Sequence, residues 1–238
     1  MEFKSLFMLS KWQEKAQVLS DKLNNLDFTT VCEPEELGYD PKIVKRSAPS
    51  GDRFLVNMLS DFNITNQDSI LDIGCGKGSA IRKMLQFPFA KVDGLELSEH
   101  IAGIAVENFK KLEVTRTNVF IADATKFQEY DEYNFIYLYD PFPSSVMDFV
   151  VESLMQSLQR SPRELVVIYN NPVCHASLVN QKRFFKAGIY PDNWGNTIAI
   201  YSNYQNSDSR LSSNKNMMRT TNEVSIGPVD INSEPKSA

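Results

Sequence analysis

The 238-residue sequence is short of cysteine, histidine and long apolar runs. Its three cysteines, Cys32, Cys75 and Cys174, are far apart and only two histidines accompany them, so neither a disulfide framework nor a zinc site is expected. The N-terminus lacks the apolar core of a signal peptide, and no run approaches the roughly 18 apolar residues of a membrane-spanning helix. These absences predict a cytoplasmic protein without a membrane span or a bound metal ion.

The sequence also has no excess of positive charge. Lys and Arg number 25 against 30 Asp and Glu, which gives a formal net charge of −5. Proteins whose surface is built to bind phosphate backbones normally carry clustered Lys and Arg. The nearest candidates, residues 110–111 and 160–163, read as solvated helix ends. The composition therefore argues against a nucleic-acid partner, although a local basic stripe can survive in an acidic protein.

Strand-like apolar runs alternate with helical patterns over the middle of the chain. This alternation predicts an α/β fold, a doubly wound and mostly parallel sheet with helices on both faces. We expect one domain with a single core. The expected strands are 69–73, 91–96, 118–122, 134–139, 164–169 and 197–202, and the expected helices are 52–59, 78–86, 98–111, 144–159 and 175–187.

Two segments of different character flank this core. Residues 3–26 carry apolar side chains at helical spacing and predict an amphipathic helix that packs on the core by default. Residues 26–49 hold three prolines and read as a loop with a short turn of helix. After residue 203, Ser, Asn, Asp, Lys and Thr dominate, and such a segment cannot offset its ordering entropy. We therefore expect residues 204–238 to be disordered.

The most informative stretch is residues 69–79, SILDIGCGKGS. It predicts a buried strand that ends in an acid, a glycine-rich turn and the start of a helix. Glycines let the backbone turn sharply and approach a ligand closely, and a helix N-terminus offers unpaired N–H groups. A nucleotide-like ligand is therefore expected. The dinucleotide pattern G-x-G-x-x-G would need glycine at Ser79, which disfavours an NAD-dependent dehydrogenase.

Three further acids follow predicted strands. Glu96 lies 20 residues beyond Gly76, the distance at which a carboxylate accepts hydrogen bonds from ribose hydroxyls in doubly wound folds. Asp123 follows the next strand, where an Asp would serve equally well as a helix N-cap. Asp140 opens the segment 140–143, Asp-Pro-Phe-Pro, whose two prolines make a rigid loop. Taken alone, that segment is also an ordinary proline-rich turn.

In their order and spacing, these motifs resemble those of the class I S-adenosylmethionine (SAM)-dependent methyltransferases over roughly residues 50–202. The G-x-G-x-G turn after Leu-Asp resembles motif I, and Asp-Pro-Phe-Pro resembles motif IV. The resemblance implies a Rossmann-like, seven-stranded sheet that ends in an antiparallel hairpin, with residues 187–194 supplying one of its strands. It divides the chain into an N-terminal helix with a lid-like segment (1–50), a SAM-binding domain (51–203) and the tail (204–238).

The resemblance also implies a role for each site residue. Asp72 would orient the methionine amino group directly or through a water molecule, Glu96 would bind the ribose, and Asp123 with Ala124 would bind the adenine edge. The cofactor-binding residues so implied are Asp72, Gly74, Gly76, Gly78, Glu96, Leu97, Asp123, Ala124 and Asp140, and the catalytic residues are Asp140 and Phe142. The expected cofactor is SAM, its product is S-adenosylhomocysteine, and no metal ion is involved.

Methyl transfer needs the acceptor, the methyl group and the sulfur in line, and alignment alone supplies about 7–11 kcal/mol of barrier lowering. A base is required only where the acceptor is protonated. Asp140 is the candidate, and its apolar, proline-flanked setting predicts a raised pKa. Tyr39 and Ser50 are expected as lid contacts, and Asn170 and His175 as acceptor-pocket residues, although His175 also fits an ordinary helix start. Cys75 is expected to be a small spacer in the turn.

The acceptor stays open between a small molecule, a saccharide and a protein side chain, and so does the oligomeric state. A finer resemblance is to bacterial methyltransferases with an Asp/Asn-Pro-Phe motif IV and a later strand ending in Tyr-x-Asn-Pro. A second hypothesis is amino-methylation of nucleic acids, in which Asp-Pro-Pro-Tyr holds a flipped base; Phe142 and Pro143 depart from that pattern. A third is a SAM-binding regulator without transferase activity that contacts a partner through its N-terminal helix.

Overall fold

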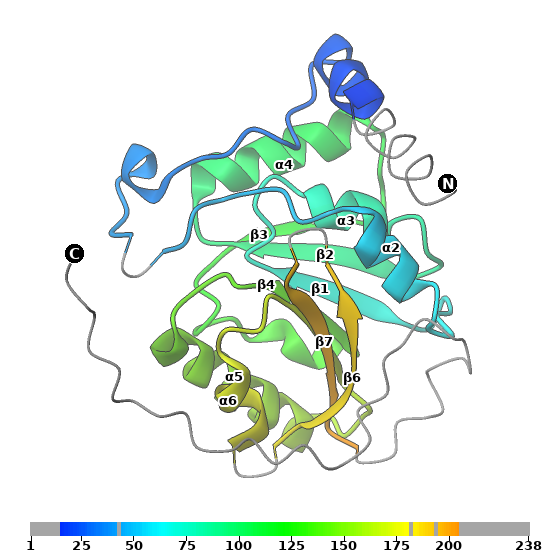
Figure 1. Ribbon diagram of the computed structural model, residues 1–238, viewed down its shortest axis with the longest axis vertical. Helices are drawn as coiled ribbons and strands as arrows, with labels where there is room; N and C mark the ends of the chain where they lie inside the picture. The colour runs from blue at the N-terminus through cyan, green and yellow to red at the C-terminus, as the bar shows by residue number, and fades with distance from the viewer. Residues whose placement is uncertain (1–14, 42–43, 181–182, 193–194, 205–238) are drawn as a thin grey trace, which may run out of the picture.

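A computed structural model of the chain describes residues 15–41, 44–180, 183–192 and 195–204 (Figure 1). The described part centres on a seven-stranded sheet with strand order β3-β2-β1-β4-β5-β7-β6. β1 to β5 are parallel, and β7 runs antiparallel to both β5 and β6. The strands are β1 (Ser69–Ile73), β2 (Lys91–Glu96), β3 (Val119–Ile121), β4 (Phe135–Tyr139), β5 (Val166–Asn170), β6 (Phe185–Pro191) and β7 (Thr197–Ser202). The predicted fold class, including the terminal antiparallel hairpin, is confirmed.

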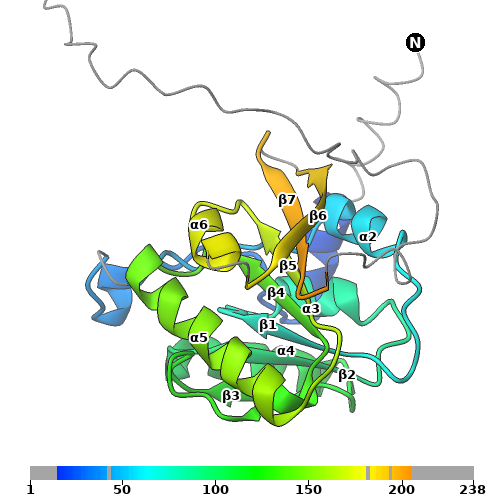
Figure 2. The ribbon, with the colours of Figure 1, turned by 90° about the horizontal axis from the view of Figure 1, so that it is seen from below.

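Helices cover both faces of the sheet. α2, α3 and α4 pack on one face, while η2, α5 and α6 pack on the other, as Figure 2 shows for α2 and α3 against α5 and α6. No helix among the described residues is long and apolar enough to cross a membrane. The helices are η1 (Pro34–Leu37), α2 (Arg53–Leu59), α3 (Ser79–Met84), α4 (Glu99–Lys111), η2 (Glu129–Glu132), α5 (Ser144–Arg160) and α6 (His175–Val179), preceded by helical residues 15–23.

The central strand β4 is apolar throughout because both of its faces are buried. In β4, Phe135 and Tyr137 belong to the core under α2 and α3, while Ile136 and Leu138 belong to the core under α5. Successive side chains of a strand point to opposite faces, so a strand covered on both sides needs an apolar residue at nearly every position. Such strands appear in the sequence as short, continuous apolar runs, which is why they could be predicted.

The predicted helix 175–187 is wrong beyond Val179. α6 ends there, and residues 185–187 belong to β6, which pairs with β7 at the edge of the sheet. Pairing between strands outweighed the local helical pattern. The predicted hairpin segment 187–194 corresponds to β6, which starts two residues earlier and ends at Pro191, and the remaining predicted elements of the sheet domain agree with the structure to within one or two residues.

The N-terminal helix is described only over residues 15–23. There, Leu19 and Leu23, which were expected on its packed face, are exposed, and Asp21 is buried. The helix therefore lies against the domain through a polar side chain. The rest of the predicted helix, residues 3–14, and the predicted tail from residue 205 onward lie outside the described residues.

Residues 28–41 and 44–50 form a strap between this helix and α2. The strap is closed at its base by two hydrogen bonds, from the Cys32 N–H to the Ser47 carbonyl and from the Ser47 N–H to the Cys32 carbonyl, both 3.0 Å. Figure 1 shows the strap at the end of the molecule where the carboxyl ends of the parallel strands lie. Ligands of open α/β sheets bind outside those ends, so the strap is placed to cover a site there.

Candidate functional site

A cavity of about 760 Å³ opens at the carboxyl ends of β1 to β4. Its volume lies within the roughly 300–1,000 Å³ typical of small-molecule sites. The strap forms one side of it, with Tyr39 and Ser50 among the lining residues. The loops after the strands form the other side and contribute these predicted site residues: Gly74, Glu96, Leu97, Asp123, Ala124, Asp140 and Phe142.

The glycine turn, residues 74–78, is shaped by close contacts that leave no room for side chains. Gly74 has φ 77°, and a Cβ placed on it would lie 2.7 Å from the Pro141 Cβ. A Cβ on Gly76 would lie 2.7 Å from the Ser47 Oγ, and one on Gly78 would lie 2.6 Å from the Phe109 ring. Gly74 thus lies against the motif IV loop and lines the cavity. Gly76 and Gly78 were predicted as cofactor contacts but do not line the cavity. Gly76 instead leaves room for Ser47 of the strap, and Gly78 leaves room for Phe109 of α4.

Glu96 ties the glycine turn to the end of β2. Its Oε2 accepts a hydrogen bond from the Gly76 N–H (3.0 Å), and its Oε1 accepts one from the Ser98 N–H (2.9 Å). Burial raises the pKa of this carboxyl, and the hydrogen bonds oppose that shift. A carboxylate has about four lone-pair sites, so Glu96 keeps capacity for hydroxyl donors from the cavity.

Asp72 lies behind the cavity wall, not on it. It is buried on the α2 side of the sheet, directly across from Tyr137 in the β1–β4 register, and its Oδ2 has no hydrogen-bond partner among the described residues. Burial, and then the charge of Glu96, raise its pKa well above the ordinary value. Its predicted contact with an amino group of a ligand is therefore not a direct one in this geometry.

Replacing Asp72 with asparagine is expected to increase the stability of the ligand-free protein at pH 7–8. A carboxyl whose pKa is raised on folding binds its proton more tightly in the folded state, so it costs stability at pH values above its unfolded pKa of about 3.9. The Asp72→Asn variant should thus gain free energy of unfolding over wild type as the pH rises from 4 to 8. Urea unfolding across that range measures the difference, and a variant less stable at pH 8 than at pH 4 relative to wild type would contradict the expectation.

Asp123 caps its own loop as well as lining the cavity. Its Oδ1 accepts hydrogen bonds from the N–H (2.9 Å) and the hydroxyl (2.7 Å) of Thr125. Partial burial alone would raise the pKa of Asp123, but these bonds and the nearby Lys126 lower it. No helix starts directly after Asp123, so its side chain is not a helix N-cap; it caps the turn at residues 124–126.

The motif IV loop, residues 140–143, carries an unusual backbone. Asp140 has φ 36°, and Asn171, which follows the neighbouring strand β5, has φ 52°; each precedes a proline. The left-handed region is rare for non-glycine residues, and such strain is concentrated at functional sites. The Asn171 Nδ2 donates to the Asp140 Oδ2 (3.4 Å), while the Asp140 Oδ1 is buried without a partner among the described residues.

The pKa of Asp140 is raised because the carboxyl is partly buried, and Lys45 opposes the shift. The direction is the one predicted from the sequence. Phe142 is buried and lines the cavity beside it. Asn171 was not predicted, although the repeated dipeptides Asp-Pro and Asn-Pro after adjacent strands mark two matching turns.

Two predicted acceptor-pocket residues do not line the cavity. Asn170 is buried behind it, where its Nδ2 donates to the Tyr137 hydroxyl (3.4 Å). His175 lies at the start of α6 with its Nδ1 2.7 Å from the Tyr201 hydroxyl, and burial lowers its pKa. Asn170 thus faces Tyr137, in the core under α2, and His175 faces Tyr201 on β7. Cys75 is buried against Gly94, as expected of a spacer.

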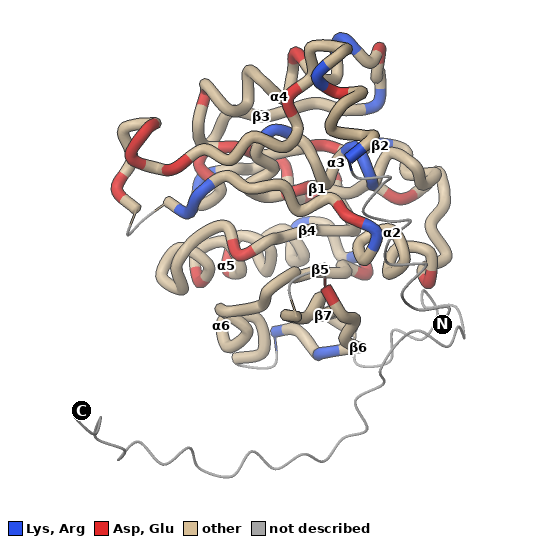
Figure 3. The backbone as a smooth tube through the Cα atoms, turned by 45° about the horizontal axis from the view of Figure 1, so that its top comes forward, with Lys and Arg blue, Asp and Glu red and all other residues tan. Residues whose placement is uncertain are grey.

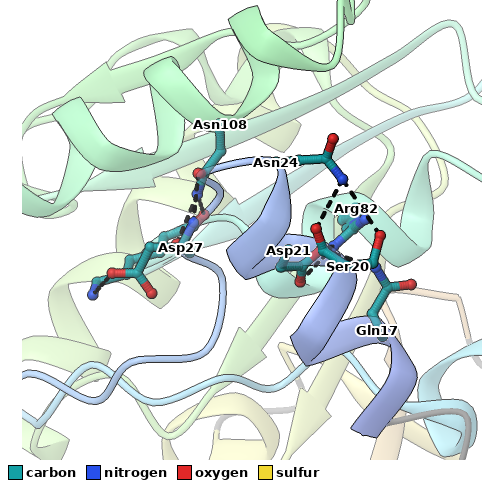
Figure 4. Close-up of polar contacts among 8 residues, drawn as sticks. Gln17, Ser20, Asp21, Asn24, Asp27, Arg82 and Asn108 are labelled. Atoms are coloured by element: carbon teal, nitrogen blue, oxygen red, sulfur yellow. Dashed lines mark hydrogen bonds and ion pairs between the residues drawn. The ribbon is translucent and has the colours of Figure 1, made fainter.

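Two ionic contacts attach the N-terminal segment to the glycine turn and the helix after it (Figure 4). The Lys77 Nζ, from the buried second half of the turn, lies 2.5 Å from the Asp27 Oδ2. Asn108 on α4 accepts from the Asp27 N–H (2.9 Å) and donates to the Asp27 carbonyl (2.8 Å). The Arg82 Nη1 on α3 donates to both carboxylate oxygens of Asp21, at 2.7 and 2.9 Å. These contacts hold the segment that leads into the strap against the glycine turn, α3 and α4.

Replacing Asp27 with asparagine is expected to lower the free energy of unfolding by about 1–3 kcal/mol. The change leaves the buried Lys77 ammonium without its counter-ion, and breaking a buried pair typically costs about 3–5 kcal/mol; the lower figure reflects a carboxylate that is 37% exposed. Urea unfolding measures the loss. The double variant Asp27→Asn/Lys77→Met is expected to recover part of it, and equal losses in the two variants would contradict this explanation.

Known proteins were compared with the chain by sequence and by fold. A family model described as a methyltransferase domain matches residues 70–163. No curated protein matches the sequence. Solved structures resemble the fold of the chain at low identity. They include a mutant of MtNAS in complex with S-adenosylmethionine (18% identity, TM-score 0.48), the putative methyltransferase yhhF from Escherichia coli (14%, 0.49) and a SAM-dependent methyltransferase from Aquifex aeolicus (15%, 0.47).

The MtNAS match covers 63% of this chain and 60% of that chain. The yhhF match covers 63% and 83%, and the Aquifex aeolicus match covers 62% and 88%, in the same order. The sheet has the strand order typical of class I methyltransferases, and the family match begins in β1 and runs through the glycine turn and the motif IV loop to the end of α5. Residues 70–163 thus match a methyltransferase domain, and they lie in a sheet with the strand order of class I methyltransferases.

Proposed function

We propose that this protein transfers the methyl group of SAM to an acceptor presented at the motif IV loop. The observation that carries the proposal is a single cavity that joins Gly74, Glu96 and Asp123 on one side to Asp140 and Phe142 on the other. Donor and acceptor could therefore occupy adjoining parts of one site. The acceptor is a small molecule, a saccharide or a protein side chain.

The residues present fit SAM. Gly74 lines the cavity without a side chain, so a ligand can lie close to its backbone, and the spare acceptor capacity of Glu96 suits two ribose hydroxyls. Ala124 and Asp123 lie at the end of β3, where an N–H donor and a carboxylate acceptor match the edge of adenine. When bound, SAM supplies an electrophilic methyl group on a sulfonium.

The protein's own task is alignment and proton removal. Pro141 packs on Gly74, so the motif IV loop is held at a fixed distance from the glycine turn. Asp140 presents an unpartnered carboxylate oxygen, and a raised pKa makes a carboxylate a stronger base near neutral pH. We assign Asp140 to accept the proton that a hydroxyl or ammonium acceptor must lose, and Phe142 to exclude water beside it.

We further propose that the domain belongs to the bacterial group with an Asp/Asn-Pro-Phe motif IV. The supporting observation is that both turns of that pattern, Asp140-Pro141 and Asn171-Pro172, stand side by side and are joined by a hydrogen bond. The three cysteines are free thiols, which supports a reducing, cytoplasmic location. No metal ion is needed for the transfer as assigned.

Calorimetric titration with SAM and S-adenosylhomocysteine tests the proposal, followed by incubation of cell fractions with radiolabelled SAM and the protein. We expect micromolar binding of both ligands and labelling in a fraction that survives nuclease treatment. Absence of SAM binding would contradict the proposed function. Binding without labelling in any fraction would favour a regulatory SAM-binding protein, and nuclease-sensitive label would favour nucleic-acid amino-methylation.

A further inference from the structure

Two cations of the strap line the cavity and have no ion-pair partner among the described residues. They are Lys45 and Arg46, and both are exposed. The third cation of the lining, Lys77, is already paired with Asp27. Figure 3 shows a stretch of positive charge on the strap next to its short undescribed gap. A pair of cations that are not engaged in ion pairs on a cavity wall attracts an anionic group of a ligand.

Lys45 and Arg46 share the cavity wall with Tyr139 and Asp140 at the end of β4, and they act on the charges of those two groups. Lys45 opposes the pKa rise of Asp140, and Arg46 opposes that of Tyr139. The acids of the nucleoside half are engaged elsewhere, since Glu96 accepts from two backbone N–H groups and Asp123 from Thr125. Of the other two lining acids, Glu33 stands across from Arg46 beside the antiparallel Cys32–Ser47 bridge, with no ion pair joining the two among the described residues, and Glu35 lies in η1. Lys45 and Arg46 therefore belong to the acceptor half.

The facing wall of the acceptor half is apolar. Phe142, Val146 and Phe149 line it from the motif IV loop and the first turns of α5. Phe149 is 65% exposed, at the mouth of the cavity. A large exposed aromatic side chain beside a cavity is typical of a surface that contacts a ligand. The acceptor half thus combines a cationic strap with an aromatic wall.

We propose that Lys45 and Arg46 bind a carboxylate or phosphate of the methyl acceptor, whose apolar or aromatic part lies on Phe142, Val146 and Phe149. The proposal rests on the proposed function and deepens it, because it names the acceptor class. The planar guanidinium of Arg46 suits bidentate contact with either anion, and the Lys45 ammonium adds a mobile point charge. The reactive atom of the acceptor then faces Asp140.

Ligand-observed NMR tests the acceptor class on protein saturated with S-adenosylhomocysteine, which fills the donor half. Four probes of similar shape are compared: phenyl phosphate, benzoate, benzyl alcohol and benzylamine. We expect the two anions to bind at least 10-fold more tightly than the alcohol and the amine, and their affinity to fall with added salt. Equal binding of all four probes, or tightest binding of benzylamine, would overturn the proposal.

The variant Lys45→Glu/Arg46→Glu is expected to lose at least 10-fold in affinity for the two anions and to keep the affinity for benzyl alcohol. Its matched control is Lys22→Glu/Lys110→Glu, which makes the same charge change at two exposed positions away from the cavity. The control should bind the anions as wild type does. An equal loss in both variants would overturn the proposal, and thermal melts confirm that each variant is folded.

A second titration separates the acceptor from SAM, which carries a carboxylate of its own. S-adenosylhomocysteine and 5′-methylthioadenosine, which lacks the amino-acid portion, are titrated into wild type and Lys45→Glu/Arg46→Glu. We expect unchanged affinity for both. A loss confined to S-adenosylhomocysteine would assign the cations to the cofactor carboxylate and overturn the acceptor assignment. Failure of the wild type to bind either nucleoside would instead count against the proposed function.

Discussion

Replacing Glu96 with alanine is expected to raise the dissociation constant for SAM about 100-fold or more. The change removes the acceptor for the Gly76 and Ser98 N–H groups, so the glycine turn loses its tie to β2, and it also removes the predicted ribose contacts. Hydrogen bonds to a charged group are each worth about 1.5–3 kcal/mol, and 1.4 kcal/mol is tenfold in affinity. Calorimetry with SAM measures the change.

Two comparison variants sharpen this result. Glu96→Gln keeps the shape and one carbonyl acceptor, and we expect it to weaken SAM binding about 10-fold, between wild type and alanine. Glu99→Ala removes an exposed acid from the first turn of α4, near the same strand end, and should leave the affinity unchanged. Wild-type affinity in Glu96→Ala would show that the nucleoside does not lie at the end of β2.

Replacing Asp140 with alanine is expected to lower kcat by about 10²–10⁴-fold and to change SAM affinity less than about 3-fold. A positioned general base typically contributes that factor to the rate, whereas the nucleoside contacts lie at the ends of β1 to β3. The measurement is methyl transfer to the acceptor identified by the radiolabel screen, alongside calorimetry with SAM. Asp148→Ala, which removes an exposed acid of α5, should retain wild-type turnover.

The Asp140→Asn variant separates proton removal from positioning. Asparagine can keep the contact with Asn171 but cannot accept a proton, so turnover as low as in Asp140→Ala indicates a base, and recovered turnover indicates a positioning group. Because burial raises the pKa of Asp140, wild-type kcat/KM should fall as pH falls, with an inflection above the ordinary aspartate value of about 3.9. Unaltered turnover in Asp140→Ala would remove the residue from the mechanism.

The sequence predicted those features of the fold and the site that are marked by a short, local pattern of residues. The central strands β4 and β5 are almost entirely apolar because both their faces are buried, and Glu96, Asp123 and Asp140 stand at strand ends that a parallel sheet brings to one edge. The cavity lining was therefore predictable at these three positions. The same reasoning assigned Gly76 and Gly78 to the ligand, but their missing side chains make room for Ser47 and Phe109.

The sequence was uninformative where residues far apart in the chain meet. Asp27 contacts Lys77 and Asn108, which are 50 and 81 residues away, and no local pattern marks such pairs. His175 and Asn170 were assigned to the pocket because they follow a strand end, but their side chains face Tyr201 and Tyr137. The direction in which a side chain leaves a loop depends on backbone angles, such as the positive φ of Asn171, that residue type alone does not determine.

The position of β7 has a consequence for how the chain folds. It is the last strand to be synthesised among the described residues, yet it is an interior strand, hydrogen-bonded to β5 on one side and β6 on the other. Until residues 197–202 have left the ribosome, β5 is an open sheet edge and β6 has no neighbour to pair with. Unpaired edges of this kind promote aggregation, and pairings between distant segments form slowly. A nascent chain stalled before residue 197 should therefore depend on chaperones, whereas one stalled well beyond residue 202 can close the sheet.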